Sequence, residues 1–133
     1  QYLEYSLKYI KKILKKLSED PITSKTPTIV FARDPKCNLN EFKLDDLSCY
    51  GMFTSIDPSS AISIFEGTHA LQGNLDPKIL LEEDSVIKES ALKMLSEFKD
   101  FPGYIFNLGH GITPDINPDK VKVLVEAIRE SGS

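Results

Sequence analysis

Arginine is scarce in this chain of 133 residues, where Arg33 and Arg129 are the only two among 16 basic residues. A guanidinium group binds carboxylates and phosphates through paired hydrogen bonds, which a lysine cannot reproduce. A polyanionic ligand must therefore find most of its arginines elsewhere. The net charge of -4 also argues against nucleic-acid binding, which usually requires a strongly basic face.

Cysteine is equally sparse, since Cys37 and Cys49 are the only two. Their spacing forms no C-x-x-C motif, so it indicates neither a zinc site nor a redox site. Reduced thiols in an intracellular compartment are expected, although spacing alone leaves a disulfide open. A zinc site would need both cysteines to converge with His69 and His110 from unrelated positions.

Long apolar runs and the common catalytic loops are also missing. No run approaches the roughly 18 residues of a membrane span, and no secretion signal is evident, so a soluble protein is expected. The sequence contains no Walker loop and no Ser-His-Asp elbow. The acidic cluster Glu82, Glu83 and Asp84 is typical of a solvated helix start.

Helical patterns are present at both ends of the chain and between them. Apolar residues at alternating spacings of four and three predict an amphipathic helix over residues 3–17, ended by Asp20-Pro21. A second helix is predicted around residues 87–98, with Asp84 or Ser85 as its cap. Asn117 and Pro118 predict the start of a last helix, which Gly132 would end. Weaker patterns predict helices over residues 39–47 and 59–65.

Four short β-prone segments alternate with these helices. They lie at residues 28–32, 50–56, 69–75 and 103–108. The first is almost wholly apolar, which predicts a strand buried on both faces. Alternating strands and helices indicate an α/β fold with a parallel sheet. The spacing of the four strand-helix units matches half of a (β/α)8 barrel, whereas an open doubly wound sheet would need a Gly-rich phosphate turn that is missing.

Polar residues cluster where the last two predicted strands end, which is the edge where α/β folds bind ligands. His110 lies between two glycines that leave its imidazole accessible, and an imidazole can bind a carboxylate or move a proton. Gln72 and Asn74 end the preceding strand and could face the same ligand. The alternatives are a tight turn around His110 and a close-packing role for Gly73. His69, at the opposite end of its strand, is expected to be structural.

Two segments together resemble the closing motifs of the uroporphyrinogen decarboxylase family: LQGNLDP at residues 71–77 and GYIFNLGHGITPD at residues 103–115. The buried strand at residues 29–32 and the helix before it are also similar, so the resemblance covers essentially the whole chain. One departure lies after Gly51, where the family usually has an Asp-Trp-Thr type sequence and this chain has Phe53, Thr54 and Ser55. An altered barrel wall is expected there.

The resemblance implies a single-domain (β/α)8 barrel, of which residues 1–133 would be a C-terminal half. It implies removal of CO2 from the acetate side chains of uroporphyrinogen III to give coproporphyrinogen III, in haem biosynthesis, with no metal or organic cofactor. His110 matches the family's substrate-binding histidine. The family's aspartate, arginines, tyrosine and serine have no counterpart here, so no catalytic residue is assigned and the chain alone is expected to be inactive.

Two other functions remain open from the sequence. Cobalamin-linked methyltransferases share the fold but use a cysteine-rich zinc site, where this chain has His110. The chain could also be a non-catalytic assembly module. Because open sheet edges favour pairing, the chain is expected not to be a monomer but to form a homo-oligomer or to pair with the missing N-terminal half. The family resemblance implies a cytoplasmic enzyme, with a plastid as the alternative.

Overall fold

Four short parallel strands form the centre of the structure, a computed structural model that describes residues 1–132. The strands pair in chain order, and their bounds are β1 Ile29–Phe31, β2 Cys49–Gly51, β3 Ala70–Gln72 and β4 Tyr104–Ile105. Each lies inside one of the four segments predicted, or begins one residue before it, and is shorter than that segment. The predicted α/β class with a parallel sheet is confirmed.

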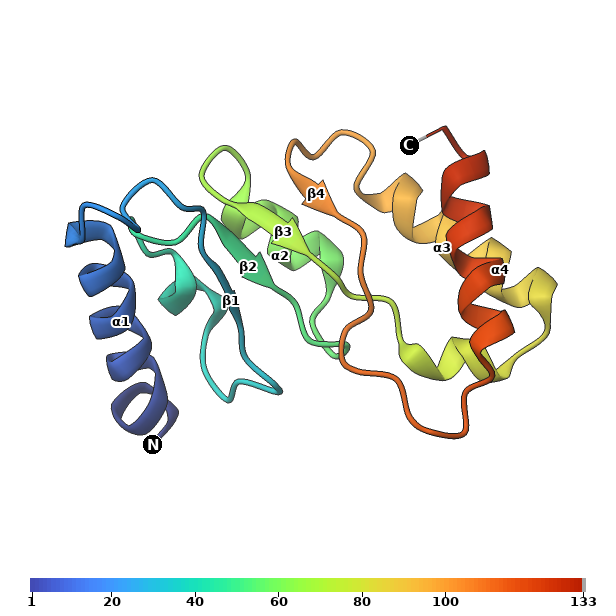
Figure 1. Cartoon of the computed structure of the whole chain (residues 1–133), viewed down its shortest axis with the longest axis horizontal. Helices are drawn as coiled ribbons and strands as arrows, with labels where there is room; N and C mark the ends of the chain where they lie inside the picture. The colour runs from blue at the N-terminus through green and yellow to red at the C-terminus, as the bar shows by residue number, and fades with distance from the viewer. Residues whose placement is uncertain (133) are drawn as a thin grey trace.

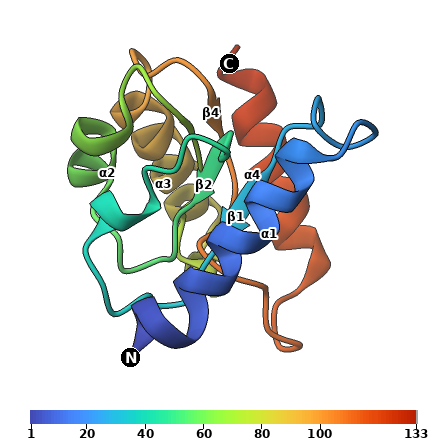
Figure 2. The ribbon, with the colours of Figure 1, turned by 90° about the vertical axis from the view of Figure 1, so that its left-hand side faces the viewer.

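Helices precede and follow the strands. Their bounds are a π-helical turn at Leu3–Leu7 that continues into α1 Lys8–Glu19, then α2 Pro58–Phe65, α3 Asp84–Glu97 and α4 Pro118–Glu130, with 3-10 segments at Leu39–Phe42 and Pro77–Leu81. In Figure 1 the strands form a row between α1 at one end and the α3–α4 pair at the other. Figure 2 looks along this row from the α1 end. No helix within residues 1–132 has the length and apolar character needed to cross a membrane.

Side-chain caps explain where several helices begin. Asn117 caps α4 as predicted, because its side chain accepts a hydrogen bond from the backbone N–H of Asp119 at 3.0 Å. The predicted cap of α3 is wrong. Glu83 occupies the cap position without a side-chain bond, and the Asp84 carboxylate instead accepts a hydrogen bond from Lys120 of α4 at 2.7 Å. This ion pair ties the starts of the two helices together.

The helix predicted over residues 39–47 is also wrong, because only Leu39–Phe42 is helical and it is a 3-10 segment. The Asn38 side chain accepts a hydrogen bond from the Asn40 backbone N–H at 2.9 Å and starts the turn. The backbone leaves helical geometry at Lys43, with ψ at 83°. The apolar spacing therefore predicted a longer helix than the chain forms. A segment this short is not stable as a helix unless tertiary contacts support it.

One face of the sheet, which carries Tyr50 and Tyr104 and which we call the outer face, packs against the helices. Tyr50 of β2 is fully buried, with its ring 4.7 Å from that of Phe42 and 5.3 Å from that of Phe65 in α2. Tyr104 of β4 stacks on Phe98, just after α3, at 4.0 Å. A second cluster of buried apolar side chains, Leu75, Leu80, Ile87, Ala91, Ile116, Leu124 and Ala127, joins α3 and α4 to the segment after β3. The side chains on the outer face thus hold the strands, and with them the residues at the strand ends, in place.

The other face of the sheet, which we call the inner face, is not covered by any helix within residues 1–132. Ile29 and Phe31 of β1 are 50% and 48% exposed, and Ile105 of β4 is 43% exposed. The prediction that β1 is buried on both faces is therefore wrong. Its apolar run fits a strand with two apolar faces, but only Val30 points toward the core cluster, and the strand forms an edge of the sheet.

Candidate functional site

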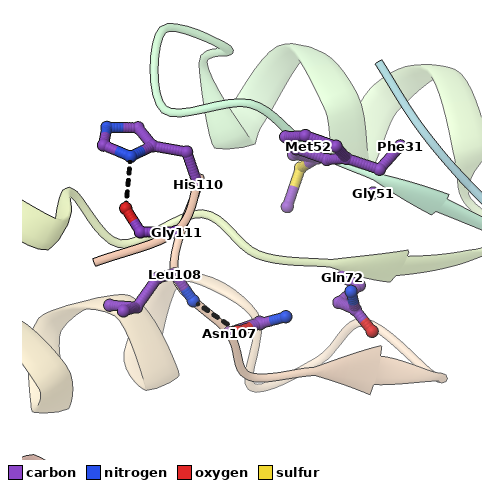
Figure 3. Close-up of a pocket in the computed structure, with 8 residues that line it drawn as sticks. All are labelled: Phe31, Gly51, Met52, Gln72, Asn107, Leu108, His110 and Gly111. Atoms are coloured by element: carbon purple, nitrogen blue, oxygen red, sulfur yellow. Dashed lines mark hydrogen bonds between the residues drawn. The ribbon is translucent and has the colours of Figure 1, made fainter. Parts of the chain in front are cut away.

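A hollow of about 260 Å³ lies on the inner face, where the parallel strands end (Figure 3). Strands β1, β2 and β3 contribute their last residues or the residue that follows, and the loop after β4 closes the hollow. The lining residues are Phe31, Gly51, Met52, Gln72, Asn107, Leu108, His110 and Gly111. The hollow therefore lies at the carboxyl ends of parallel strands, the position where ligands bind in α/β folds.

His110 brings a titratable imidazole to this hollow. Its Nδ1 lies 2.8 Å from the carbonyl oxygen of Gly111, and Figure 3 shows this contact as a dashed line. Because a carbonyl oxygen only accepts hydrogen bonds, Nδ1 carries a proton. Nε2 has no hydrogen-bond partner within residues 1–132, so it is the ring atom that can meet a ligand. Neutral imidazole would accept there, and protonated imidazole would donate.

Two amide side chains accompany His110 in the hollow. Asn107 turns its Oδ1 to the backbone N–H of Leu108 at 2.8 Å, which leaves its NH2 group for a ligand. Gln72 lines the hollow at the end of β3, which agrees with the ligand-facing alternative of the two that the sequence left open. The structure therefore brings Gln72 and His110 to one hollow, with Asn107 of the same motif beside them. Among the lining residues, His110 carries the single titratable side chain.

Asn74 does not face this hollow, which corrects the prediction that it accompanies Gln72. Alternation along an extended strand would place the two on the same face. The chain departs from that geometry at Gly73, whose φ of 118° is accessible to glycine and rarely to other residues. Asn74 is consequently buried, at 4% exposure, and bonds to the segment that follows β2.

Sequence reasoning missed the apolar part of the hollow, formed by Phe31, Gly51 and Met52. A β-carbon on Gly51 would lie 3.1 Å from that of Phe31, so glycine lets the Phe31 side chain lie over β2. The register pairs Phe31 with Gly51, and Gly51 with Gln72. Phe31, Gly51 and Gln72 therefore form a row on one face of the sheet. Counting alternate residues back from each strand end could have identified this row from the sequence.

The remaining candidate residues lie outside the hollow. The His69 ring contacts the carbonyl oxygen of Leu44 through Nε2 and the hydroxyl of Thr68 through Nδ1, both at 2.9 Å. These contacts support the structural role expected for it. Cys37 and Cys49 are free thiols whose pKa values are raised by burial, and a raised pKa leaves little thiolate. No three His, Cys, Asp or Glu side chains gather as a metal site in residues 1–132.

Comparison with known proteins identifies the chain by sequence. The family model described as "Uroporphyrinogen decarboxylase (URO-D)" matches residues 1–131. A uroporphyrinogen decarboxylase from Alcanivorax borkumensis is 36% identical over 129 residues, which are 97% of this chain and 36% of that protein. One from Chlorobium chlorochromatii is 39% identical over 138 residues, covering 99% of this chain and 38% of that protein. The chain thus spans little more than a third of the length of these relatives.

A solved structure supports the fold. A methyltransferase from Methanosarcina mazei superposes on 99% of this chain with a TM-score of 0.75, over 37% of its own length and with 17% sequence identity. At that identity the likeness concerns the fold alone, and together with the parallel sheet it confirms the predicted part-barrel architecture. The family predicted from residues 71–77 and 103–115 is confirmed by the sequence matches. This chain belongs to the uroporphyrinogen decarboxylase family.

Proposed function

We propose that this chain supplies part of the active site of a uroporphyrinogen decarboxylase, which converts uroporphyrinogen III to coproporphyrinogen III. The observation that carries the proposal is the position of His110, in a hollow at the carboxyl ends of the strands with Nε2 free to meet a ligand. The reaction is inferred from membership of the family. The hollow is the place where we propose that one edge of the substrate binds.

The reaction replaces each acetate side chain by a methyl group. A proton first adds to the pyrrole ring. The bond between the methylene carbon and the carboxylate then breaks, CO2 leaves, and the electron pair of that bond is taken up by the protonated pyrrole. A second proton forms the new C–H bond and the ring proton is released, which restores the pyrrole. His110 has the geometry to bind a substrate carboxylate, because a protonated ring with Nδ1 bound to Gly111 presents Nε2–H to the hollow. The NH2 group of Asn107 is a second donor on the same wall.

The chain alone is expected to be inactive. None of the residues lining the hollow is an arginine or a lysine, although a substrate with many carboxylates requires several cationic partners. Arg33 lies just beyond β1 and Arg129 lies in α4, and these are the only arginines in the sequence. Apart from His110, the cationic partners of such a substrate are therefore expected to come from outside this chain.

The same incompleteness supports a pairing partner. Ile29 and Phe31 on the inner face of β1 and Ile13 on the exposed side of α1 are about half exposed, and β1 is an edge of the sheet. An apolar edge of this kind favours pairing with another chain. Since the chain spans 36% to 38% of its relatives, we propose that the partner is the remainder of the barrel, with a second copy as the alternative outcome.

Decarboxylation assays test the proposal. Uroporphyrinogen is incubated with this chain alone, and then with this chain mixed with the part of the Alcanivorax borkumensis relative that lies outside the match. Activity is expected only in the mixture, and His110→Asn should reduce it. His69→Asn is the matched control, because it removes the other histidine of the chain away from the hollow. Sedimentation of the mixture reports assembly, so an assembled but inactive mixture would refute the function and a well-folded monomer would refute the pairing.

A further inference from the structure

Asn74 lies where three loops at the carboxyl edge of the sheet meet. It follows β3 and is the one buried polar or charged residue among those described in residues 1–132. Its neighbour Leu75 forms a parallel bridge with Leu108, so the segment after β3 also touches the loop after β4. Such a residue, with a polar side chain almost wholly removed from water, requires hydrogen-bond partners that account for its position.

The Asn74 amide holds the loop after β2 in one conformation. Its Nδ2 donates hydrogen bonds to the carbonyl oxygens of Phe53, at 2.9 Å, and Ile56, at 2.7 Å. These two carbonyls belong to a turn that is closed by the bond from the Ile56 N–H to the Phe53 carbonyl at 3.0 Å. The amide group therefore uses both of its N–H donors on a single turn, across 21 and 18 positions of sequence.

The same side chain also contains an unsatisfied hydrogen-bond acceptor. Asn74 Oδ1 is buried and has no hydrogen-bond partner within residues 1–132. An unpartnered buried acceptor lowers stability. The amide therefore stabilises the protein less than its two hydrogen bonds suggest, and its clearest effect is to fix the position of the turn.

The turn held by Asn74 is the surface on which His110 rests. A β-carbon on Gly109 would lie 2.6 Å from the backbone nitrogen of Thr54 and nearer still to its Oγ1, so the backbone before His110 lies directly against this turn. The ring of Phe53 lies 5.8 Å from the ring of His110, with the two planes inclined by 32°. A displacement of residues 53–56 would therefore move both the support of the backbone before His110 and the aromatic ring beside its imidazole.

We propose that Asn74 is a positioning residue for His110, acting through the turn formed by residues 53–56. The contacts described above support the placement of His110 by this turn. The effect of that placement on catalysis rests on the proposed function. Asn74 itself is not among the residues that line the hollow. The specific combination is a buried amide that fixes the turn and a glycine that lets the His110 loop pack on that turn.

Histidine NMR of the 133-residue chain tests the placement of His110 by this turn. The sequence contains two histidines, so His69, which bonds to Leu44 and Thr68, is an internal reference. In folded Asn74→Ala, the His110 ring signals are expected to shift or broaden while those of His69 stay in place. Unchanged His110 signals, or equal changes at both histidines, would overturn the proposal. Asn74→Ser, which keeps a donor, should give a smaller change and remains available if the alanine variant does not fold.

A double substitution tests the route. Phe53→Leu removes the aromatic contact but leaves the backbone carbonyl that Asn74 binds. If Asn74 acts through this turn, its substitution should change the His110 signals less in the Phe53→Leu background than in the unsubstituted chain. Full additivity of the two changes would contradict this route.

An activity measurement separates this inference from the proposed function. In the assembled mixture, Asn74→Ala should lower kcat/KM by about tenfold to a hundredfold, because a carboxylate-binding group displaced by about 1 Å no longer orients the substrate. If His110→Asn leaves activity intact while the NMR result holds, the proposed function fails and the positioning stands. If His110→Asn abolishes activity while Asn74→Ala leaves the His110 signals and kcat/KM unchanged, the positioning fails alone.

Discussion

The same substitution at two tyrosines on the sheet should have opposite effects on stability. Tyr50 of β2 is fully buried, and its hydroxyl has no hydrogen-bond partner within residues 1–132. Tyr104 of β4 donates its hydroxyl to the carbonyl oxygen of Gly73 at 2.5 Å. Burial raises the pKa of both phenols, so both are neutral near pH 7. Replacing either by phenylalanine removes one oxygen and keeps the ring stacking.

The magnitudes follow from the two hydroxyl environments. An unpartnered buried hydroxyl costs about 1–3 kcal/mol in lost hydration, and the van der Waals contacts of one oxygen offset part of this gain when it is removed. Tyr50→Phe is therefore expected to raise the free energy of unfolding by about 1 kcal/mol. Tyr104→Phe should lower it by about 1–2 kcal/mol, because it breaks a hydrogen bond and removes a donor from Gly73.

Urea unfolding followed by circular dichroism measures the difference. Both variants should keep the unfolding slope of the unsubstituted chain and move the midpoint in opposite directions. The contrast between the two variants is expected to be about 2–3 kcal/mol, which exceeds the error of extrapolation for a small protein. A loss of stability in Tyr50→Phe, or no change in Tyr104→Phe, would refute the reasoning from these hydroxyl contacts.

Three further substitutions test other parts of the structure. Gly109→Ala should lower stability by about 1–3 kcal/mol in thermal unfolding, because its β-carbon would meet the Thr54 backbone at 2.6 Å. His69→Ala should cost about 1 kcal/mol by urea unfolding, through loss of the bond to the Leu44 carbonyl, and should leave the His110 NMR signals unchanged. Hydrogen bonds from the start of α2 lower the pKa of Asp57, so its contribution is present above a pH of about 4 and is lost as pH falls through the lowered value. Asp57→Asn should therefore lose stability less steeply in acid.

The sequence predicted the elements better than their extents. Four β-prone segments between helical patterns were sufficient for the parallel sheet, because the alternation itself implies crossovers. Helix starts were predictable where a side-chain cap preceded Pro, as at Asn117. The segment at residues 39–47 was not, because a 3-10 turn and a helix begin with the same apolar spacing. Ile29 and Phe31 were placed in a strand buried on both faces, because an apolar run does not show whether a second layer covers its other face.

The candidate site divides at Gly73 into a part that could be predicted and a part that could not. Up to Gln72, alternation along β3 correctly places a side chain in the hollow. At Gly73 the backbone has a φ of 118°, and the face on which Asn74 lies no longer follows from counting residues. Two polar residues of one motif therefore have different positions, one on the hollow and one beneath the turn that supports His110. A glycine inside a polar motif is thus the position at which alternation should no longer be extended, since it is the residue able to reverse the face of everything after it.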